Sequence, residues 1–236
     1  MNPPKLRDQG PTAETAAGVS YRVIGTALEI QLAEHAIFAP NTCVTWRSPS
    51  VELALKPGSR PQMGKSAGGD LAYAAFLVET RAAGVIGLSR SGIGKPFAIH
   101  LPPGGRIDVR QDSLLAATAN VHYTWQEMER SQTAWGGARY IDTFWTTDAP
   151  GIVWLQSDGD VLEATLADGD ALDVFGDCWL YKDASVGVIT GSQTFGEAAG
   201  LAQSYTLTAR LVGQRFTGPG RLAWQTYVDS DLSTSL

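Results

Sequence analysis

The sequence predicts an all-β protein, and three observations support this class: composition, apolar alternation and an internal repeat. Of the 236 residues, 44% are hydrophobic, enough to form the core of one large β domain or two small ones. Glycine occurs 26 times and charged residues make up only 18%. This balance is typical of many short strands joined by tight turns, rather than of long solvated helices.

Residues 1–18 are predicted to be a flexible leader, because they contain three prolines and little apolar sequence. They lack the apolar run of a secretory signal, and no later stretch approaches the roughly 18 apolar residues of a membrane helix. We therefore expect a cytoplasmic protein without a membrane-spanning helix, while association with a membrane surface stays open. The remainder, 19–236, is predicted to be a single β domain with a short C-terminal tail.

The first strands come directly after the leader. Apolar side chains alternate with polar or small ones over Tyr21–Val23 and Leu28–Leu32, as in half-buried strands. A polar break at Glu34-His35-Ala36 precedes a further apolar pair, Ile37-Phe38. These segments predict the first three strands of the domain.

An internal repeat organises the rest of the chain. The run Leu101–Val109 matches Leu166–Val174 in its Leu, Gly, aliphatic, Asp and Val positions, at an offset of 65 residues. The same offset carries Leu115 onto Leu180 and Val121 onto Val186. A third copy is predicted upstream, where Phe38 and Val44 stand 77 residues before Leu115 and Val121.

A closing strand repeats as well, at Gly84–Leu88, Gly151–Leu155 and Gly220–Trp224. In each, large apolar residues occupy the third and fifth places, so that both side chains lie on one face. We therefore predict three pseudo-repeats of about four strands each, approximately 19–100, 101–165 and 166–228. Their apolar faces are expected to cover one another in a closed or sandwiched body.

The last repeat contains the clearest turn. Two alternating runs within Tyr205–Tyr227 flank Thr217-Gly218-Pro219-Gly220, which predicts a β-hairpin. The most helical-looking segment, Gln126–Gln132, spans only about two turns, so we expect it to decorate a loop.

The run Arg215–Arg221 (RFTGPGR), followed two residues later by Trp224-Gln225-Thr226, closely resembles the terminal motif of the altered inheritance of mitochondria protein 24 family. The openings at Leu101 and Leu166 and the steps Phe38-Ala39-Pro40 and Leu115-Ala116 resemble the repeat starts of that family, and the likeness spans about Tyr21 to Val228.

The resemblance implies a fold like that of the trp RNA-binding attenuation protein superfamily, with double-stranded β-helix or sandwich-like units in pseudo-threefold repeats. It also implies a mostly bacterial group without an established enzymatic activity, whose eukaryotic members are mitochondrial. The family's Leu-Phe-Ser-Gly-Glu-Gly-like run is echoed only at Ser66–Asp70 and Thr194–Glu197. The middle repeat, with Trp135-Gly136-Gly137, departs furthest from it.

Several motifs that suggest chemistry have simpler structural interpretations. Ser91–Pro96 has neither the glycine spacing nor the Ser or Thr of a phosphate loop, which favours a β-turn. The histidines, His35, His100 and His122, lack the spacing of a cupin-type metal site. Asp158-Gly159-Asp160 and Asp168-Gly169-Asp170 could suggest calcium or an acid–base pair, but we predict Asp-Gly turns between strands.

Aromatic, basic and thiol residues are also assigned structural roles. Trp125, Trp135, Trp145 and Trp154 could line a stacking platform, but aromatics in strands are more often core or interface residues. The net charge of −6 and the spread of Arg210, Arg215 and Arg221 over one hairpin oppose nucleic-acid binding. Cys43 and Cys178 are predicted to be buried thiols, with a disulfide left open if they meet.

We predict a non-enzymatic β scaffold that binds an unknown protein partner and forms homo-oligomers, with no catalytic, cofactor-binding or metal site and no cofactor. Two alternatives stay open. One is a small-ligand-binding or cupin-like enzymatic protein, which rests on fold analogy. The other is a membrane-surface or organelle-organisation factor, which rests on the mitochondrial relatives.

Overall fold

The computed structural model describes residues 4–7, 13–16, 19–32, 37–57, 62–64, 73–75, 77–90, 94–128, 140–175, 178–198 and 207–226. Within these ranges the chain forms antiparallel strands and one short 3-10 turn, η1 (Asn41–Cys43), with no α-helix. The predicted all-β class is confirmed. The same ranges contain no helix of the length and apolarity that crossing a bilayer requires.

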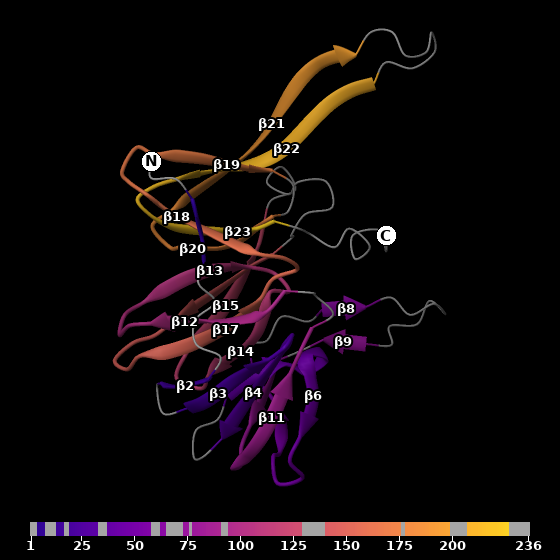
Figure 1. Ribbon diagram of the computed structural model, residues 1–236, viewed down its shortest axis with the longest axis vertical. Coiled ribbons are helices and arrows are strands. Elements are labelled where there is room, and N and C mark those ends of the chain that lie inside the picture. Colours follow the sequence, from indigo (N-terminus) through magenta and orange to yellow (C-terminus); the bar gives the residue numbers. More distant parts are fainter. Residues whose placement is uncertain are drawn as a thin grey trace.

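Two large sheets form the middle of the molecule (Figure 1). The six-stranded sheet has the order β12 (Pro96–Leu101), β17 (Gly151–Gln156), β14 (Leu114–Thr118), β5 (Ile37–Pro40), β10 (Leu77–Thr80) and β7 (Leu53–Leu55). The seven-stranded sheet has the order β1 (Lys5–Leu6), β18 (Val161–Leu166), β23 (Gly220–Gln225), β20 (Trp179–Asp183), β13 (Arg106–Arg110), β16 (Tyr140–Trp145) and β15 (His122–Glu127).

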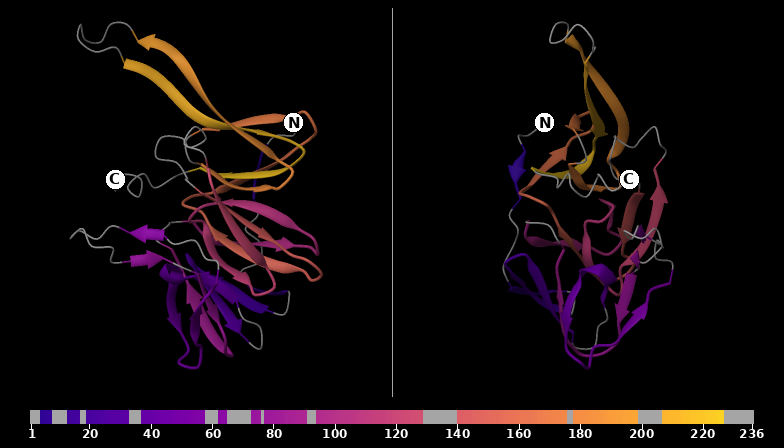
Figure 2. Two further views of the ribbon diagram at one scale, coloured as in Figure 1. Left: turned by 180° about the vertical axis from the view of Figure 1, so that it is seen from behind. Right: turned by 90° about the vertical axis from the view of Figure 1, so that its right-hand side faces the viewer.

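Smaller sheets lie at the two ends of the stack (Figures 1 and 2). The five-stranded sheet has the order β2 (Ala13–Ala16), β3 (Val19–Ile24), β4 (Ala27–Leu32), β11 (Gly84–Leu88) and β6 (Val44–Arg47). The three-stranded sheet has the order β19 (Ala171–Phe175), β22 (Leu207–Thr217) and β21 (Gly187–Ala198). A separate ribbon joins β8 (Gln62–Gly64) to β9 (Tyr73–Ala75).

Three apolar cores separate these layers. One lies between the five- and six-stranded sheets and includes Ile30 and Trp154. The second lies between the six- and seven-stranded sheets and includes Phe97 and Phe144. The third lies between the seven- and three-stranded sheets and includes Phe216. The two large sheets are thus covered on both faces, which explains why every residue of β17 is buried.

Strand pairing repeats one scheme along the chain. Three groups of strands follow one another: β4–β7 with β10 and β11, then β12–β17, then β18–β23. In each group, the last strand pairs with the first and third strands of that group. The second-last strand pairs with its second and fourth strands. The central strands of these triplets are β11 and β10, then β17 and β16, then β23 and β22. Each group therefore has six strands, rather than the four or so predicted for each repeat.

Neighbouring groups share a sheet. Strand β14 pairs with β5, and β20 pairs with β13 in the same antiparallel manner. Phe38 on β5 lies opposite Ala117 on β14. Strand β5 pairs with the second-last strand of its group, β10, whereas β14 pairs with the last strand of the next group, β17, so the predicted equivalence of Phe38 with Leu115 is wrong.

The predicted hairpin at Thr217–Gly220 is also wrong, because its two strands belong to different sheets. Strand β22 pairs with β19 and β21, whereas β23 pairs with β18 and β20. The connection is a corner between layers: the Gly218 amide donates to the Asp170 carbonyl at 3.0 Å, and Gly220 has a φ of +137°. A Cβ at Gly218 would lie 2.1 Å from the Ala167 carbonyl oxygen, so only glycine fits there.

Two segments differ from their predictions. The predicted leader contributes β1, which pairs with β18, and β2, which pairs with β3. Gln126 and Glu127 continue β15 as a strand, and Glu129–Gln132 lie outside the described residues.

The remaining strand predictions are confirmed. The segments Tyr21–Val23, Leu28–Leu32 and Ile37-Phe38 lie in β3, β4 and β5. The closing strands are β11, β17 and β23, and in each the third and fifth residues face one core. Val153 and Leu155, for example, are both in the core between the six- and seven-stranded sheets. Period-two alternation thus identified the correct faces.

Candidate functional site

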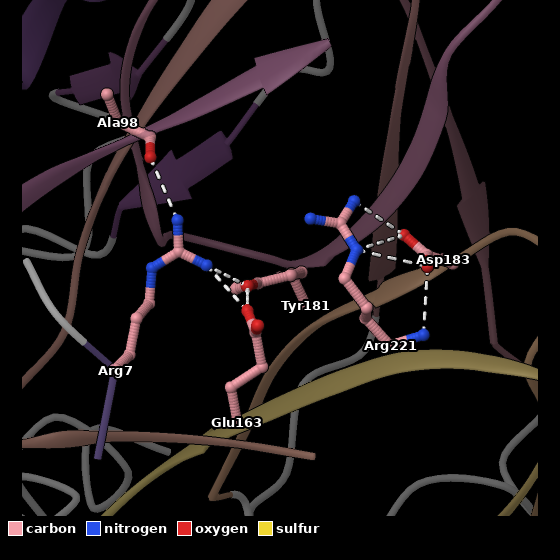
Figure 3. Close-up of polar contacts among 6 residues, drawn as sticks. All are labelled: Arg7, Ala98, Glu163, Tyr181, Asp183 and Arg221. Carbon is pink, nitrogen blue, oxygen red and sulfur yellow. Dashed lines mark hydrogen bonds and ion pairs between the residues drawn. The ribbon is translucent and has the colours of Figure 1, made fainter. Parts of the chain in front are cut away.

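The described part of the chain contains a buried charge network centred on Arg7, the residue directly after β1 (Figure 3). Its Nη1 donates to Glu163 Oε2 at 2.6 Å and to the hydroxyl of Tyr181, which in turn donates to the same Glu163 oxygen. The side chains of Arg7 and Glu163 are only 16% and 26% exposed. Glu163 and Tyr181 come from β18 and β20, which are separated by β23 in the seven-stranded sheet.

The same guanidinium reaches the six-stranded sheet. Arg7 Nη2 donates to the carbonyl oxygen of Ala98 at 3.0 Å (Figure 3). Ala98 lies on β12, an edge strand, so this bond satisfies an acceptor that no described strand pairs with. The guanidinium carbon also lies 4.9 Å from the ring centroid of Phe97 and 5.4 Å from that of Tyr181. Arg7 therefore joins the two large sheets at their edges.

The electrostatics of this network favour a protonated Tyr181. Burial, above all, raises the pKa of the Tyr181 hydroxyl far above its ordinary value of 10.0, although Arg7 opposes the shift. The phenol is thus a fixed hydrogen-bond donor between a guanidinium and a carboxylate at any physiological pH. This arrangement suits the recognition of a cation, because three acceptors and two aromatic rings surround the Arg7 guanidinium.

A second pair lies beside the first. Arg221 of β23 and Asp183 of β20 form a forked contact, with Nη2 at 2.9 Å from Oδ1 and Nε at 3.2 Å from both oxygens (Figure 3). Asp183 Oδ2 also accepts the backbone amide of Arg221 at 2.8 Å. The hydrogen bond to Asp183 raises the pKa of the Arg221 guanidinium. This pair ties two neighbouring strands together.

A third network occupies the seven-stranded sheet. Lys182, whose side chain is 6% exposed, donates to Asp108 Oδ2 at 2.7 Å and to the Val186 carbonyl at 2.8 Å. Thr143 donates to the other oxygen of Asp108 at 2.8 Å. Because each charge has a partner on another strand, these groups cross-link the sheet.

The histidines are not brought together in the described residues. His100 lies on β12 of the six-stranded sheet and His122 on β15 of the seven-stranded sheet, while His35 lies outside the described residues. The His122 ring stacks on Trp145 at a centroid distance of 5.3 Å. Across the described ranges, no group of three potential metal ligands is assembled.

The Asp-Gly segments are turns that connect sheets. At the second, Asp170 accepts the Ala167 amide through its side chain and donates its own amide to the Ala167 carbonyl, both at 3.1 Å. Gly169 between them has a φ of +79°. At the first, the buried Asp158 exchanges two hydrogen bonds with Gln225, at 3.0 and 3.3 Å. The structural interpretation of both motifs agrees with these contacts.

The tryptophans divide between core and surface. Trp154 is fully buried, and its ring meets Tyr21 edge-on at 5.2 Å. Trp125 on the edge strand β15 is 37% exposed and meets Tyr140 edge-on at 5.5 Å. Trp135 and residues 91–93 of the phosphate-loop-like motif lie outside the described residues. Among the described tryptophans of this set, Trp125 is thus the exposed one, and it lies at an edge of the seven-stranded sheet.

The basic and thiol residues have local roles. Arg215 forms a bidentate ion pair with Asp173, at 2.7 and 2.8 Å, and the hydrogen bond from Arg215 lowers the pKa of that carboxyl. Arg210 lies on β22, but its side chain is outside the described residues. Cys43 and Cys178 are not joined in a disulfide, and the former is buried and the latter half-buried. Burial raises the pKa of Cys43 to about 11.

Sequence reasoning missed Arg7 altogether. The residue stands in a proline-containing segment, and neither Glu163 nor Tyr181 belongs to a motif. The one available signal was local: Glu163 stands two residues after Val161, on the same face of the strand, and Val161 is in the core between the two large sheets. A buried carboxylate on such a face requires a cationic partner.

Stacked antiparallel sheets joined by cross-strand ion pairs define the class of this protein: a layered, all-β body without a helical layer in its described residues. The chain belongs to the family described as mitochondrial biogenesis AIM24, which it matches over residues 21–227. The resemblance drawn from the RFTGPGR run is thereby confirmed.

The fold is similar to the crystal structure of protein SPYM3_0169 from Streptococcus pyogenes, with a TM-score of 0.64. The alignment covers 92% of this chain and 98% of that chain, at 16% sequence identity. At this identity the likeness concerns the fold alone. No curated protein matches the chain.

Proposed function

We propose that this protein is a non-enzymatic β scaffold that acts by binding protein partners and by associating with copies of itself. The observation that carries the proposal is the exposed edge strand β15, whose side chains, apart from half-buried Tyr123, face solvent. An edge strand offers unpaired backbone groups to a further strand. Exposed aromatic side chains are enriched at protein interfaces.

The scaffold is built, on this proposal, from three related units that form a sandwich-like body of the double-stranded β-helix kind. The recurring pairing scheme supports this three-unit arrangement. A close approach between the first residue of each closing strand and a valine after an earlier turn also supports it. A Cβ on the first residue of the closing strand, Gly84, Gly151 or Gly220, would lie 2.6, 2.5 or 2.8 Å from a valine methyl. The three valines are Val51, Val121 and Val186.

These valines come after equivalent turns. The amides of Val51, Val121 and Val186 each donate to the carbonyl three residues earlier, at 3.0, 2.9 and 3.0 Å. The counterpart of Val121 in the first unit is therefore Val51, and not Val44 as the sequence offset of 77 residues predicted. The units begin at the first strand of each group, so that Pro96 and Val161 open the second and third units.

The charge networks support a structural role for the ionisable groups. Arg7, Arg221 and Lys182 each engage a carboxylate on another strand, at 2.6, 2.9 and 2.7 Å. The charge of each cation is already neutralised by a carboxylate of the protein. Such a cation stabilises the association of strands and does not stabilise a reacting group.

Self-association is tested by light scattering coupled to size-exclusion chromatography over a range of protein concentrations. We expect the mass to exceed 25.1 kDa and to increase in whole-number multiples of it. Trp125→Ser is expected to weaken association about tenfold, because it removes an exposed aromatic side chain from the β15 edge.

The control is Ile24→Ser, which changes a 46% exposed side chain on the five-stranded sheet and should leave the mass unchanged. Circular dichroism shows whether each variant keeps its strand content. A wild-type chain that stays monomeric at the highest concentration would remove self-association from the proposal. A Trp125→Ser variant that associates as tightly as wild type would place the interface elsewhere.

A further inference from the structure

We propose that the edge of β18, together with the pocket that holds the Arg7 side chain, is a peptide-recognition site whose ligand is an extended segment bearing an arginine. Residues 5–7 of the chain occupy this site and are its resident ligand. A partner with the same chemistry would bind by displacing them. The inference rests on the proposed partner-binding function and specifies the chemistry of one partner site.

The backbone part of the site is a sheet edge. Lys5 and Leu6 lie opposite Glu163 and Leu162, and the Arg7 amide donates to the Val161 carbonyl at 2.8 Å. Addition of an extended segment to a sheet edge is a common mode of peptide recognition, in which main-chain bonds give affinity and pockets give specificity. Apart from the arginine, the side chains of the bound segment add little to the binding, since the Leu6 side chain is 65% exposed.

The side-chain part of the site selects a guanidinium. Its two terminal nitrogens bond in different directions, one to the Glu163 carboxylate and the Tyr181 hydroxyl, the other to the Ala98 carbonyl at 3.0 Å. The planar group also lies over the rings of Phe97 and Tyr181. A lysine ammonium is a point charge and cannot make the divergent bonds and the stacking together.

The site and its occupant come from different parts of the chain. Phe97, Glu163 and Tyr181 lie inside the stretch 21–227 that matches the family, whereas Arg7 lies outside it. The occupant forms a strand of only two residues, Lys5–Leu6. The residues that hold the guanidinium therefore lie within the stretch that matches the family, and the segment that they bind comes from the region before that stretch.

The test uses the full chain with Arg7→Ala, which disables the resident ligand, and a fluorescent peptide with the sequence of residues 1–10. We expect the peptide to bind this variant at least tenfold more tightly than wild type in fluorescence anisotropy, because the wild-type site is filled. Matched peptides with lysine or citrulline in place of the arginine should bind at least tenfold more weakly. Adding Glu163→Gln to the variant should abolish the preference for arginine.

Equal binding to wild type and Arg7→Ala, no binding to a folded Arg7→Ala variant, or equal binding of the citrulline peptide would overturn the proposal. If Arg7→Ala does not fold by itself, the arginine peptide is added during refolding, and recovery of the far-ultraviolet dichroism of wild type is expected. Refolding that is indifferent to the peptide contradicts the site. None of these readouts depends on self-association, so a monomeric protein that binds the arginine peptide would remove only that part of the proposed function.

Discussion

At the scale of single residues, paired charges replace apolar contacts at the edges of the cores. Arg7, Glu163 and Tyr181 show the pattern most clearly, since each is at least half-buried and bonded to the other two. Removal of one member leaves a buried charge without its partner. Because both charged side chains retain some exposure, we place the cost of losing Arg7 at about 3 kcal/mol of unfolding free energy, at the lower end for buried pairs.

The Tyr181 hydroxyl should make stability depend on alkaline pH. Its pKa is raised in the folded state from an ordinary value of 10.0, so its contribution is complete below about pH 10 and is lost as the pH rises further. We expect the unfolding free energy from urea titrations to fall as the pH rises above about 10 in wild type. Tyr181→Phe should lower the unfolding free energy by about 1–2 kcal/mol at pH 7. Its unfolding free energy should also decline less steeply with alkaline pH than that of wild type. An unchanged alkaline decline in Tyr181→Phe would show that another group causes it.

The two thiols should differ in reactivity. Burial raises the pKa of Cys43 to about 11, so its reactive thiolate is scarce at pH 8, whereas Cys178 is half-buried. We expect a thiol reagent to label Cys178 first in the native protein and Cys43 only on unfolding, as read by peptide mass spectrometry. The control is the denatured chain, in which both thiols should react. Equal native labelling rates would contradict the packing around Cys43.

At the scale of elements, short corners carry the chain from one sheet to the next, whereas a hairpin would keep it within one sheet. The turns before β13 and β19 lead from one sheet to the next, as does the step from β22 to β23. The backbones approach closely at these corners. At Gly218 the nearest atom to an added Cβ is a carbonyl oxygen that belongs to the turn before β19.

Gly218→Ala should therefore be strongly destabilising. The added Cβ would lie 2.1 Å from the Ala167 carbonyl oxygen, and a backbone shift of both corners costs about 1–3 kcal/mol or more. Gly104→Ala is the matched control, because Gly104 has a φ of +72° but nothing within 4 Å of an added Cβ. Its cost should stay near 1 kcal/mol, from backbone strain alone. Equal losses in thermal or urea unfolding would contradict the contact at Gly218.

Local sequence patterns predicted the strands better than their partners. Period-two alternation identified β3, β4 and the closing strands because each face packs on one core. Turn chemistry could not distinguish a hairpin from a corner at Gly218-Pro219, since both require glycine and both flank alternating runs. The prediction that Phe38 and Leu115 occupy equivalent repeat positions was wrong for a related reason. Two buried strands that are neighbours in one sheet can have the same apolar pattern as two strands in equivalent positions of a repeat.

The candidate site was beyond local reasoning. Arg7 meets Glu163 and Tyr181 across 156 and 174 residues of sequence, and Ala98 contributes only a backbone carbonyl. No spacing rule connects such positions, because the sheet edges that bring them together are set by the whole topology. The family motif RFTGPGR does not identify the network either: its first residue, Arg215, bonds to Asp173 at the surface, and its last, Arg221, bonds to Asp183 beside the network and not to a member of it.

At the scale of the whole molecule, each large sheet combines strands of two of the three strand groups. The six-stranded sheet joins the first group to the second through β5 and β14, and the seven-stranded sheet joins the second to the third through β13 and β20. Unfolding one group would expose a sheet edge and half of a core in its neighbour. We therefore expect the three groups to unfold together, as a single domain.

Hydrogen exchange measured by mass spectrometry in increasing urea tests this claim most directly. Peptides that cover β4, β14 and β20 report on the first, second and third groups. The shared sheets predict that the most protected amides in all three exchange with one free energy of opening and one dependence on urea. Separate transitions, with β20 losing protection at lower urea while β4 and β14 remain closed, would contradict it.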